Sequence, residues 1–520
     1  MVVTFGDLTG HTFLLEGSAG TGKTYTLNTL MKVCQAKRIP ILASASTGIA
    51  ATRLNGATTA HSLFGIPISD NGTGTLCSTV AGDSYKGRLL KRVHIFIIDE
   101  VGMLKLDVIT AIDNLLRFLH NAEPGEANQF GRVIIIFTGD ERQIMPIIPG
   151  NVDPLGDEQA EASFFFSVYT SPNRLTRFEL TRNMRLDPQA TEFKQLQDAI
   201  GRDAVNHVKF PDDTMHQHTR YIQIPESMAR YDETSFINEI FPPSVFDLPP
   251  MDLIKRVILS SVNADVDRIN AAVVGSMPAD RPSHTYLSTN TAGEHDIHNP
   301  ENAVFSAENM QTIVDPSLPH HSLTLKVGTP VMCMQNIDVP NGLANGAMMV
   351  VTRVDRDIVW CLVNSRNGVL ELPIIPTAFD YDNKRGFTFT RIQLPLRVAF
   401  AVTNHRSQGG TYDMVGYHSL HPVWYHGGLF VVFTRCTTAA GFIVLVQPNH
   451  SGFPHPTVRN VVHPRVARNR HCECGCKPLP LDQHGNPPPP PPPPAPQAVV
   501  GEDDIDEDVP FEEYIPTTHR

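Results

Sequence analysis

The chain has 520 residues, of which 41% are hydrophobic and 18% charged, so it is long enough for two or three domains with real cores. This composition excludes a peptide hormone, a small disulfide-stapled scaffold and a wholly disordered protein. The formal net charge is −12, but residues 501–520 hold eight acids and one base and supply −7 of it, which leaves a mildly acidic body that can still carry a local basic groove.

The first part of the chain alternates short apolar runs with segments of helical length. The runs at 11–17, 38–47, 93–100 and 132–140 are rich in β-branched residues, and each ends in Gly, Thr, Glu or Asp. Continuous apolar strands bounded in this way predict an α/β fold with a parallel sheet that is covered on both faces by helices. Ligands of such sheets bind at the carboxyl ends of the strands.

The second part repeats this pattern around a different segment. A helix is predicted in 193–201, and a strand at 255–263 runs into a helix at 265–274. Residues 318–395 contain short apolar runs separated by Gly, Asn and Asp, which predict a small β-rich insertion. Parallel-sheet character returns at 396–405 and 430–435. From about residue 450 the periodicity fades.

A phosphate-binding pattern, G-x-x-x-x-G-K-[ST], follows the first predicted strand and precedes a predicted helix. Its glycines let the backbone wrap a β-phosphate, at a helix N-terminus that favours anions. The lysine would reach the β- and γ-phosphates, and the last hydroxyl would hold Mg²⁺. The alternative is a Gly-rich turn that matches by chance. The residues are Gly17, Ser18, Ala19, Gly20, Thr21, Gly22, Lys23 and Thr24.

Two more strand ends carry candidate catalytic groups. Asp99 and Glu100 end the strand at 93–100, where one carboxylate can coordinate Mg²⁺ and the other can accept a proton from the attacking water. A solvated strand end is the alternative. Gln143 follows the next strand, where an amide could orient the water or sense the γ-phosphate, although surface glutamines are common.

Together these segments resemble the Pif-type DNA helicases, the RecD-like branch of helicase superfamily one that includes viral and rolling-circle-transposon relatives. The likeness covers about residues 11–447, and its blocks occur in the order of that family. They are GSAGTGKT at 17–24, ASTGIAATRLNGATTAHSLFGIPI at 45–68, IIDEVGM at 97–103, TGDERQIMPI at 138–147, LTRNMR at 180–185, the segment 318–351, and VTNHRSQGGTYDMVG with GGLFVVFTRCTT within 402–438.

The resemblance implies two RecA-like motor domains, at 1–180 with a short insertion at about 66–92 and at 181–450 with an SH3-like, β-rich insertion at about 318–395. A disordered tail would follow at 451–520. The implied activity is an ATP-dependent DNA helicase that moves 5′ to 3′ on single strands as a monomer, opens forked or tailed duplexes, and acts in replication, repair or recombination. ATP and Mg²⁺ would be its cofactors.

The resemblance also implies roles for single residues. Thr24 and Asp99 look like the magnesium ligands, Glu100 like the catalytic base and Gln143 like the γ-phosphate sensor. Arg185 and Arg435 look like two arginines that reach the γ-phosphate from the second motor domain and stabilise charge in phosphoryl transfer.

Contacts to DNA are implied for six residues in the second and last blocks. Hydroxyls and imidazoles can bind phosphate without reading sequence, and an aromatic ring can stack on any base. For the aromatic residue a core contact is an equally good interpretation. The six are Thr47, His61, Phe64, His405, Ser407 and Gln408.

The sequence departs from the family pattern in the last block and near its start. The usual HKSQGQT reads HRSQGGT, with Arg406 and Gly410 as replacements, and Arg keeps the charge of Lys without its geometry. Only sixteen residues precede Gly17, and the first glutamine is Gln35, so the glutamine segment that reads adenine in that family does not precede the phosphate loop in the given sequence. Either the start is truncated, or the selectivity for the nucleotide base is relaxed.

The end of the chain has its own composition. Pro487 to Pro494 form a polyproline helix or coil, and the acidic segment after them resembles the tail of bacterial single-strand binding proteins. That segment is a docking peptide for a protein partner, a mimic of the DNA strand, or a solubilising tail. His471, Cys472, Cys474 and Cys476 are too crowded to favour one closed zinc site.

The cysteines and the lack of long apolar runs indicate the compartment. Five of eight cysteines are scattered, which is no disulfide framework, and no apolar run approaches the roughly 18 residues that span a bilayer. We expect an intracellular soluble protein without a membrane partner; nucleus, mitochondrion and viral replication site stay open. Two other functions also stay open: an ATPase that remodels protein–DNA complexes without unwinding, and the helicase part of a mobile-element protein.

Overall fold

The computed structural model divides into one unit at residues 1–469 and another at 470–520. No helix in its described ranges is long and apolar enough to cross a bilayer. The second unit, with the proline run, the tail cysteines and the acidic end, lies outside the described residues. Described are residues 11–67, 75–123, 126–146, 162–170, 175–184, 191–205, 207–208, 220–292, 307–366, 368–382, 387–447, 456–463 and 466.

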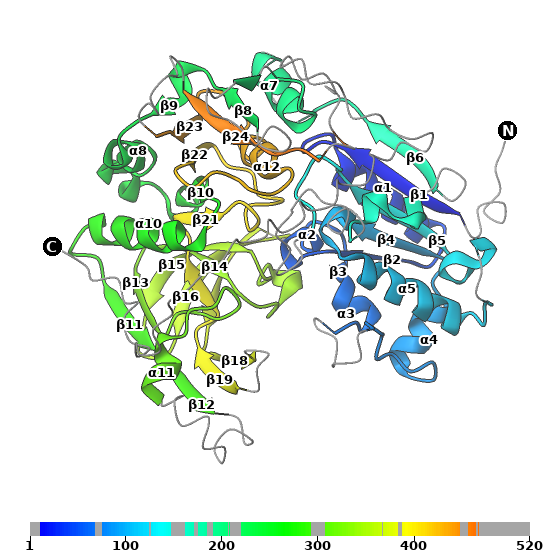
Figure 1. Ribbon diagram of the computed structural model, residues 1–520. Coiled ribbons are helices and arrows are strands. Elements are labelled where there is room, and N and C mark those ends of the chain that lie inside the picture. The colour runs from blue at the N-terminus through cyan, green and yellow to red at the C-terminus, as the bar shows by residue number, and fades with distance from the viewer. Residues whose placement is uncertain are drawn as a thin grey trace, which may run out of the picture. The chain divides into compact units, whose positions relative to one another are not determined.

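A six-stranded parallel sheet forms the first lobe, in the order β3-β2-β4-β5-β1-β6 (Figure 1). All four strands expected in this part of the sequence are present, and β3 and β6 extend the sheet at its two edges. The strands are β1 Thr12–Gly17, β2 Ile41–Ala45, β3 Thr58–Thr59, β4 Ile95–Asp99, β5 Ile134–Gly139 and β6 Leu175–Leu180.

Helices cover both faces of this sheet, because its central strands alternate their side chains between two cores. Phe96 and Ile98 of β4 pack with the apolar stripe of α5, whereas Ile95 of the same strand packs in a cluster with Cys34 of α1. The helices are α1 Lys23–Ala36, α2 Gly48–Ala51, α3 Ala60–Phe64, α4 Tyr85–Lys91 and α5 Leu106–Leu119.

A five-stranded parallel sheet forms the second lobe, in the order β21-β10-β22-β23-β9. The expected strand at 255–263 is β10, and the expected helices are α7 and α10. Its strands are β9 Ala229–Arg230, β10 Arg256–Ser260, β21 Ala401–Thr403, β22 Met414–His418 and β23 Phe442–Leu445. Its helices are α7 Thr191–Gly201, α8 Glu233–Ile240, α9 Pro250–Leu253, α10 Asn263–Ser276 and α12 Gly428–Phe433.

Two expectations for this lobe are wrong. The apolar run at 430–435 lies mostly in helix α12 and not in a strand, because every residue of α12 is buried and a helix that is apolar all round has no periodicity to reveal it. The run at 396–405 is divided: β20 joins an antiparallel sheet, and only β21 joins the parallel one.

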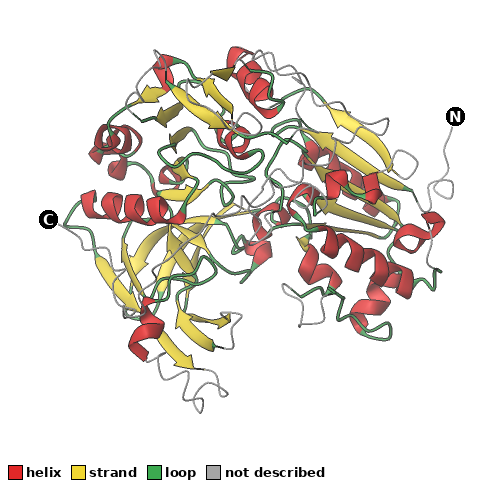
Figure 2. Cartoon of the chain, viewed as in Figure 1, coloured by secondary structure: helices red, strands yellow, loops and turns green. Residues whose placement is uncertain are grey.

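Antiparallel strands dominate the segment between β10 and β21 (Figure 2). The main sheet has the order β17-β16-β15-β14-β20, and two smaller sheets, β12-β19-β18 and β11-β13, lie beside it in the chain. The bounds are β11 Ser283–Leu287, β12 Thr289–Ala292, α11 Ala307–Thr312, β13 Ser322–Lys326, β14 Pro330–Cys333, β15 Met348–Val354, β16 Val359–Ser365, β17 Gly368–Ile374, β18 Thr377–Asp382, β19 Thr388–Gln393 and β20 Leu396–Val398.

The predicted start of the disordered tail, at residue 451, is too early. β24 (Thr457–Asn460) pairs with β8 (Arg220–Gln223), which also pairs with β7 (His207–Val208). Val458 and Val461 are buried in the core of the second lobe. The chain therefore contributes to the fold at least as far as this strand.

Candidate nucleotide and DNA site

The phosphate loop connects the end of β1 to the start of α1, as the sequence predicts. Gly20 and Gly22 have φ values of 85° and 92°, in the left-handed region that favours glycine. A Cβ on Gly17 would lie 3.0 Å from the carbonyl oxygen of Leu180. The pattern thus requires glycine for backbone reasons at all three positions.

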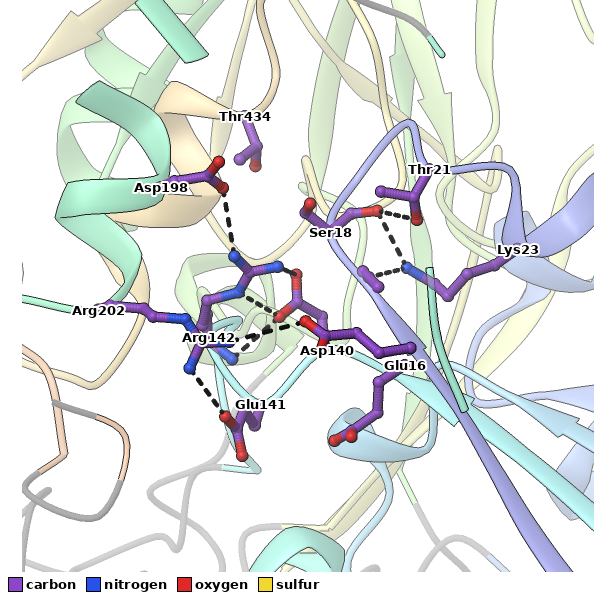
Figure 3. A network of polar contacts seen from close by, with 12 residues as sticks. Glu16, Ser18, Thr21, Lys23, Asp140, Glu141, Arg142, Asp198, Arg202 and Thr434 are labelled. Atoms are coloured by element: carbon purple, nitrogen blue, oxygen red, sulfur yellow. Dashed lines mark hydrogen bonds and ion pairs between the residues drawn. The ribbon is translucent and has the colours of Figure 1, made fainter. Parts of the chain in front are cut away.

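Lys23 is buried in this loop and points back into it (Figure 3). Its Nζ donates to the carbonyl oxygen of Gly17 and, over 3.4 Å, to that of Ser18. The Thr21 hydroxyl donates to the same Ser18 oxygen over 2.9 Å. The ammonium group therefore sits inside the ring of backbone that would surround a phosphate.

The LTRNMR segment lies directly on the phosphate loop. The side-chain amide of Asn183 donates to the carbonyl oxygen of Ala19 over 3.0 Å, and the backbone N–H of Met184 donates to that of Gly20 over 2.8 Å. Arg185 lies outside the described residues, so its assignment stays a prediction. The segment that carries it is in place next to the loop.

Asp99 and Glu100 occupy the end of β4 beside the loop. The Asp99 carboxylate accepts hydrogen bonds from the Thr138 hydroxyl and, over 3.0 Å, from the Glu100 backbone N–H. Burial, and then the neighbouring Asp99, raise the pKa of the Glu100 carboxyl, while Lys23 and Arg435 act in the opposite sense. A carboxylate with a raised pKa is the stronger proton acceptor.

The donor set fits a magnesium ion. Asp99 is 4% exposed, and Thr24 lies in the first turn of α1 after the phosphate loop, so a carboxylate and a hydroxyl flank this site. Mg²⁺ prefers oxygen ligands and is usually held by one or two protein oxygens together with substrate phosphates. Thr138 was missed by the sequence analysis, although it stands at the end of β5, where ligand-binding side chains are expected.

Arg435 enters the site from the second lobe. It is 1% exposed, and its guanidinium donates to the carbonyl oxygens of Val431 at 2.9 Å, Ser407 at 3.2 Å and Gly410 at 3.0 Å. Its charge is close enough to lower the pKa of Glu100, as does that of Arg53 from the first lobe. Arg435 therefore lies near Glu100, and its role at the γ-phosphate stays a prediction.

Arg53 is a cation that the sequence analysis did not single out. Its guanidinium nitrogen lies 3.3 Å from the position that a Cβ on Gly409 would occupy. It comes from the turn after α2, in the block at 45–68, and only three-dimensional proximity to Glu100 reveals it.

Gln143 is buried at the boundary between the lobes. It is 7% exposed, and its backbone N–H donates to the Asp140 carbonyl oxygen over 3.1 Å. Next to it, Arg142 forms ion pairs with Asp140 at 2.8 Å and with Asp198 of α7 at 3.2 Å (Figure 3). The strand-end segment that carries the predicted sensor is therefore tied to the second lobe.

The three DNA candidates of the second block differ in their surroundings. Thr47 caps α2 by accepting from the Ala50 backbone N–H over 3.3 Å, and burial lowers the pKa of His61. Phe64 is fully buried and packs on Phe96 with the ring centres 5.4 Å apart. Base stacking by Phe64 is thus wrong in this conformation, and the alternative of a core contact holds.

Of the three candidates of the last block, Ser407 contacts Arg435 through its carbonyl oxygen. The Ser407 hydroxyl is fully buried and donates to the Asn404 carbonyl oxygen over 2.7 Å. Gln408 is 6% exposed, and neither its amide oxygen nor its nitrogen has a partner among the described residues. Burial lowers the pKa of His405 to about 4, so its ring is neutral at pH 7. The surroundings of these residues fit a role in connecting Arg435 to a bound DNA strand better than a role as an open binding surface.

Comparison with known proteins agrees with these features. Residues 3–208 match a family model described as PIF1-like helicase, and residues 308–354 match one described as DNA helicase Pif1, 2B domain. The chain is 26% identical to ATP-dependent DNA helicase PIF1 of Xenopus laevis and 27% identical to that of Homo sapiens, over 84% of this chain and 59% of each relative. It therefore spans about three-fifths of the length of these relatives.

A bacterial relative and two solved structures extend this likeness. ATP-dependent DNA helicase Pif1 of Bdellovibrio bacteriovorus is 25% identical over 83% of both chains. The crystal structure of Bacteroides Pif1 bound to ssDNA superposes with a TM-score of 0.58 at 23% identity, over 85% of this chain and 90% of that one. Pif1 helicase from Candida albicans gives a TM-score of 0.56 at 21% identity, over 88% and 94%. In sequence and in fold, the chain is similar to the Pif1-like helicases.

Proposed function

We propose that the chain is an ATP-dependent DNA helicase that moves 5′ to 3′ on single-stranded DNA and opens forked or tailed duplexes. The observation that carries this proposal is the shared environment of Glu100, where cations from both lobes, Lys23 and Arg435, act on one carboxylate. Relatives named ATP-dependent DNA helicase support it. Replication, repair or recombination is the process in which we expect the activity, with the chain acting as a monomer.

The proposed chemistry divides the hydrolysis of ATP among six side chains. Lys23 and the loop N–H groups bind the β- and γ-phosphates, Glu100 accepts the proton of the attacking water, and Gln143 orients that water. Thr24 and Asp99 would hold Mg²⁺, which neutralises charge on the phosphate oxygens when it is bound. Arg435 stabilises the charge that spreads over the γ-phosphate in the transition state.

The same residues suggest how hydrolysis moves DNA. Because Arg435 belongs to the second lobe and Lys23 to the first, binding of ATP favours closure of the lobes and hydrolysis favours their opening. Arg435 is held by the carbonyl oxygens of Ser407 and Gly410, in the block to which we assign strand contacts. A change at the γ-phosphate is thereby transmitted through a few bonds to the residues that we assign to DNA binding.

We assign the two motor domains to 1–180 and 181–450, with a short insertion at about 66–92 and an SH3-like insertion at about 318–395. The strands from β13 to β19, which fall within that second range, support its β-rich character. We expect it to influence which DNA structure is opened.

The test is ATP turnover with and without single-stranded DNA, followed by unwinding of duplexes with a 5′ or a 3′ tail. We expect DNA to stimulate turnover and only the 5′-tailed duplex to open. Lys23→Ala should abolish turnover while single-strand binding persists, because phosphate binding and strand binding use different residues. Stimulated turnover without unwinding of either duplex would instead support a remodelling ATPase, and wild-type turnover in Lys23→Ala would refute the site.

A further inference from the structure

Side chains and backbone of the second lobe contact the segment from Asp140 to Gln143 of the first lobe. Arg142 pairs with Asp198 at 3.2 Å, and the Glu141 carboxylate pairs with Arg202 at 3.4 Å, both partners being in or directly after α7 (Figure 3). These contacts hold side chains of the segment. Within the segment, Asp140 accepts the backbone N–H groups of Arg142 and Gln143, and the carbonyl oxygen of Glu141 is bound by a group of the second lobe.

His426 supplies that group. Its Nε2 lies 2.9 Å from the carbonyl oxygen of Glu141, and its Nδ1 accepts the backbone N–H of His463 over 2.9 Å. Because Nδ1 accepts, Nε2 carries the proton and donates to Glu141. The ring is 2% exposed, and burial lowers its pKa to about 4, so this neutral form persists at pH 7.

The next residue brings the backbone of the second lobe against Gln143. Gly427 has a φ of 71°, and a Cβ there would lie 2.5 Å from the Arg142 carbonyl oxygen and 2.6 Å from the carbonyl carbon of Gln143. Only glycine permits this approach. The glycine is the N-cap of α12, whose Phe430 ring lies under the Arg142 guanidinium at 5.1 Å.

The same helix leads to Arg435. α12 ends at Phe433, and Arg435 follows its C-cap, Thr434. One short buried helix therefore connects the contact with Gln143, at its start, to the arginine near Glu100, just after its end. A contact that fixes the start of α12 against the Gln143 segment therefore also fixes the distance between Gln143 and Arg435.

We propose that His426 is a positioning residue for ATP hydrolysis, which holds the backbone beside Gln143 against the start of α12 so that Gln143 and Arg435 engage the γ-phosphate together. This inference rests on the proposed ATPase function. His426 touches neither phosphate nor water in this role, and the phosphate loop binds nucleotide without it. Its loss should slow the chemical step and leave nucleotide affinity unchanged.

Two substitutions separate the hydrogen bond from the space that the ring fills. In His426→Gln the amide N–H can reach the Glu141 oxygen as Nε2–H does, whereas the shorter side chain of His426→Asn keeps an acceptor near Nδ1 and loses the donor. We expect His426→Asn to lower the DNA-stimulated kcat about tenfold, since misplacement by about 1 Å can cost up to a hundredfold. His426→Gln should recover kcat to within about threefold of wild type.

ADP affinity and the melting temperature are the readouts besides activity. Both variants should bind ADP within about twofold of wild type, because phosphate-loop contacts are untouched. His284→Asn, an exposed histidine on β11, is the matched control and should leave every readout unchanged. Equal losses of kcat, ADP affinity and melting temperature in both His426 variants would overturn the proposal, because they would indicate a merely structural role.

A double-mutant cycle identifies the route of the effect. In a Gln143→Ala background, His426→Asn should change kcat by less than about twofold, because Gln143 and Arg435 can no longer act on the γ-phosphate together. A further tenfold loss there would overturn the proposal. If the wild type itself shows no ATP turnover, the proposed function fails; if it turns over ATP and His426→Asn matches it, only this inference fails.

Discussion

His405 and His426 are two histidines that the fold keeps neutral. Burial lowers the pKa of each to about 4, and the Nε2 of His405 has no partner among the described residues. Both rings lie in the second lobe, and burial is the main cause of each lowered pKa. The Asp140 carboxylate acts in the opposite sense on His426, so burial outweighs this neighbouring charge.

This predicts a loss of stability in mild acid. The unfolded chain takes up protons at the ordinary histidine pKa of about 6.5, whereas the folded chain does so only near pH 4, so the unfolded state binds more protons in between. The free energy of unfolding should fall by about 1.4 kcal/mol per pH unit for each histidine as the pH decreases from about 6.5 to about 4.

Urea unfolding at pH 7 and pH 5 checks this expectation. His405→Gln removes one titrating group and should shrink the difference between the two pH values by about 2 kcal/mol. The exposed His284→Gln should leave the difference as it is in the wild type. An unaltered difference in His405→Gln would show that this ring titrates normally in the folded chain.

Single residues also show how much of the site can be predicted from the sequence. The phosphate loop was predictable because its glycines and Lys23 are local backbone requirements of one turn. Phe64 was not, since an aromatic residue near a polar block serves equally well as a core side chain or a stacking platform. Arg53 could only be found in three dimensions, because a lone arginine carries no sign of what it will face.

At the scale of elements, the period of the apolar residues decides which helices and strands can be predicted from the sequence. The runs at 93–100 and 132–140 are predictable strands, since they are short, β-branched and bounded by polar residues. The run in α12 has the same composition but is buried on every side, so neither a period of 2 nor one of 3.6 appears. In its helical form, α12 packs against Phe193 and Gln197 of α7.

An arginine hydrogen-bonds the β-rich segment to the first lobe. Arg366, in the turn between β16 and β17, donates through Nε to the Thr52 carbonyl oxygen at 3.0 Å and through Nη2 to those of Ala51, at 3.3 Å, and Leu54. These are carbonyls at and after the C-terminal end of α2, which a cation stabilises. The block that carries Thr47 and Arg53 is thus anchored from outside its own lobe.

Removing this anchor should loosen α2 and the turn after it. In Arg366→Ala we expect the amide protons of residues 52–54 to exchange about tenfold faster, equivalent to about 1.4 kcal/mol, because the carbonyls of this turn lose a charged partner that is only partly screened by solvent. Hydrogen exchange followed by mass spectrometry measures this. Arg356→Ala, an exposed arginine of the same sheet, is the control; equal exchange in both variants would contradict the anchor.

At the scale of the whole molecule, residues that follow the last strand of the parallel sheet in the sequence complete the second lobe. β24 adds to β8 and places Val458 and Val461 in the core that also holds α12. It also leads to His463, whose backbone N–H fixes the tautomer of His426. The sequence analysis missed this strand because four residues among prolines and glycines carry too short a pattern to distinguish a strand from a coil.

Truncation on either side of β24 tests its contribution. A chain that ends at residue 469 keeps every contact described above and should melt at the temperature of the full chain. A chain that ends at residue 455 loses three buried valines, Val458, Val461 and Val466, each worth about 1.5–3 kcal/mol, so its free energy of unfolding should fall by about 4.5–9 kcal/mol. Below its melting temperature it should also turn over ATP more slowly, because His426 no longer has a fixed tautomer. Equal melting of the two truncated chains would place β24 outside the cooperative unit and would remove the structural basis for the orientation of His426.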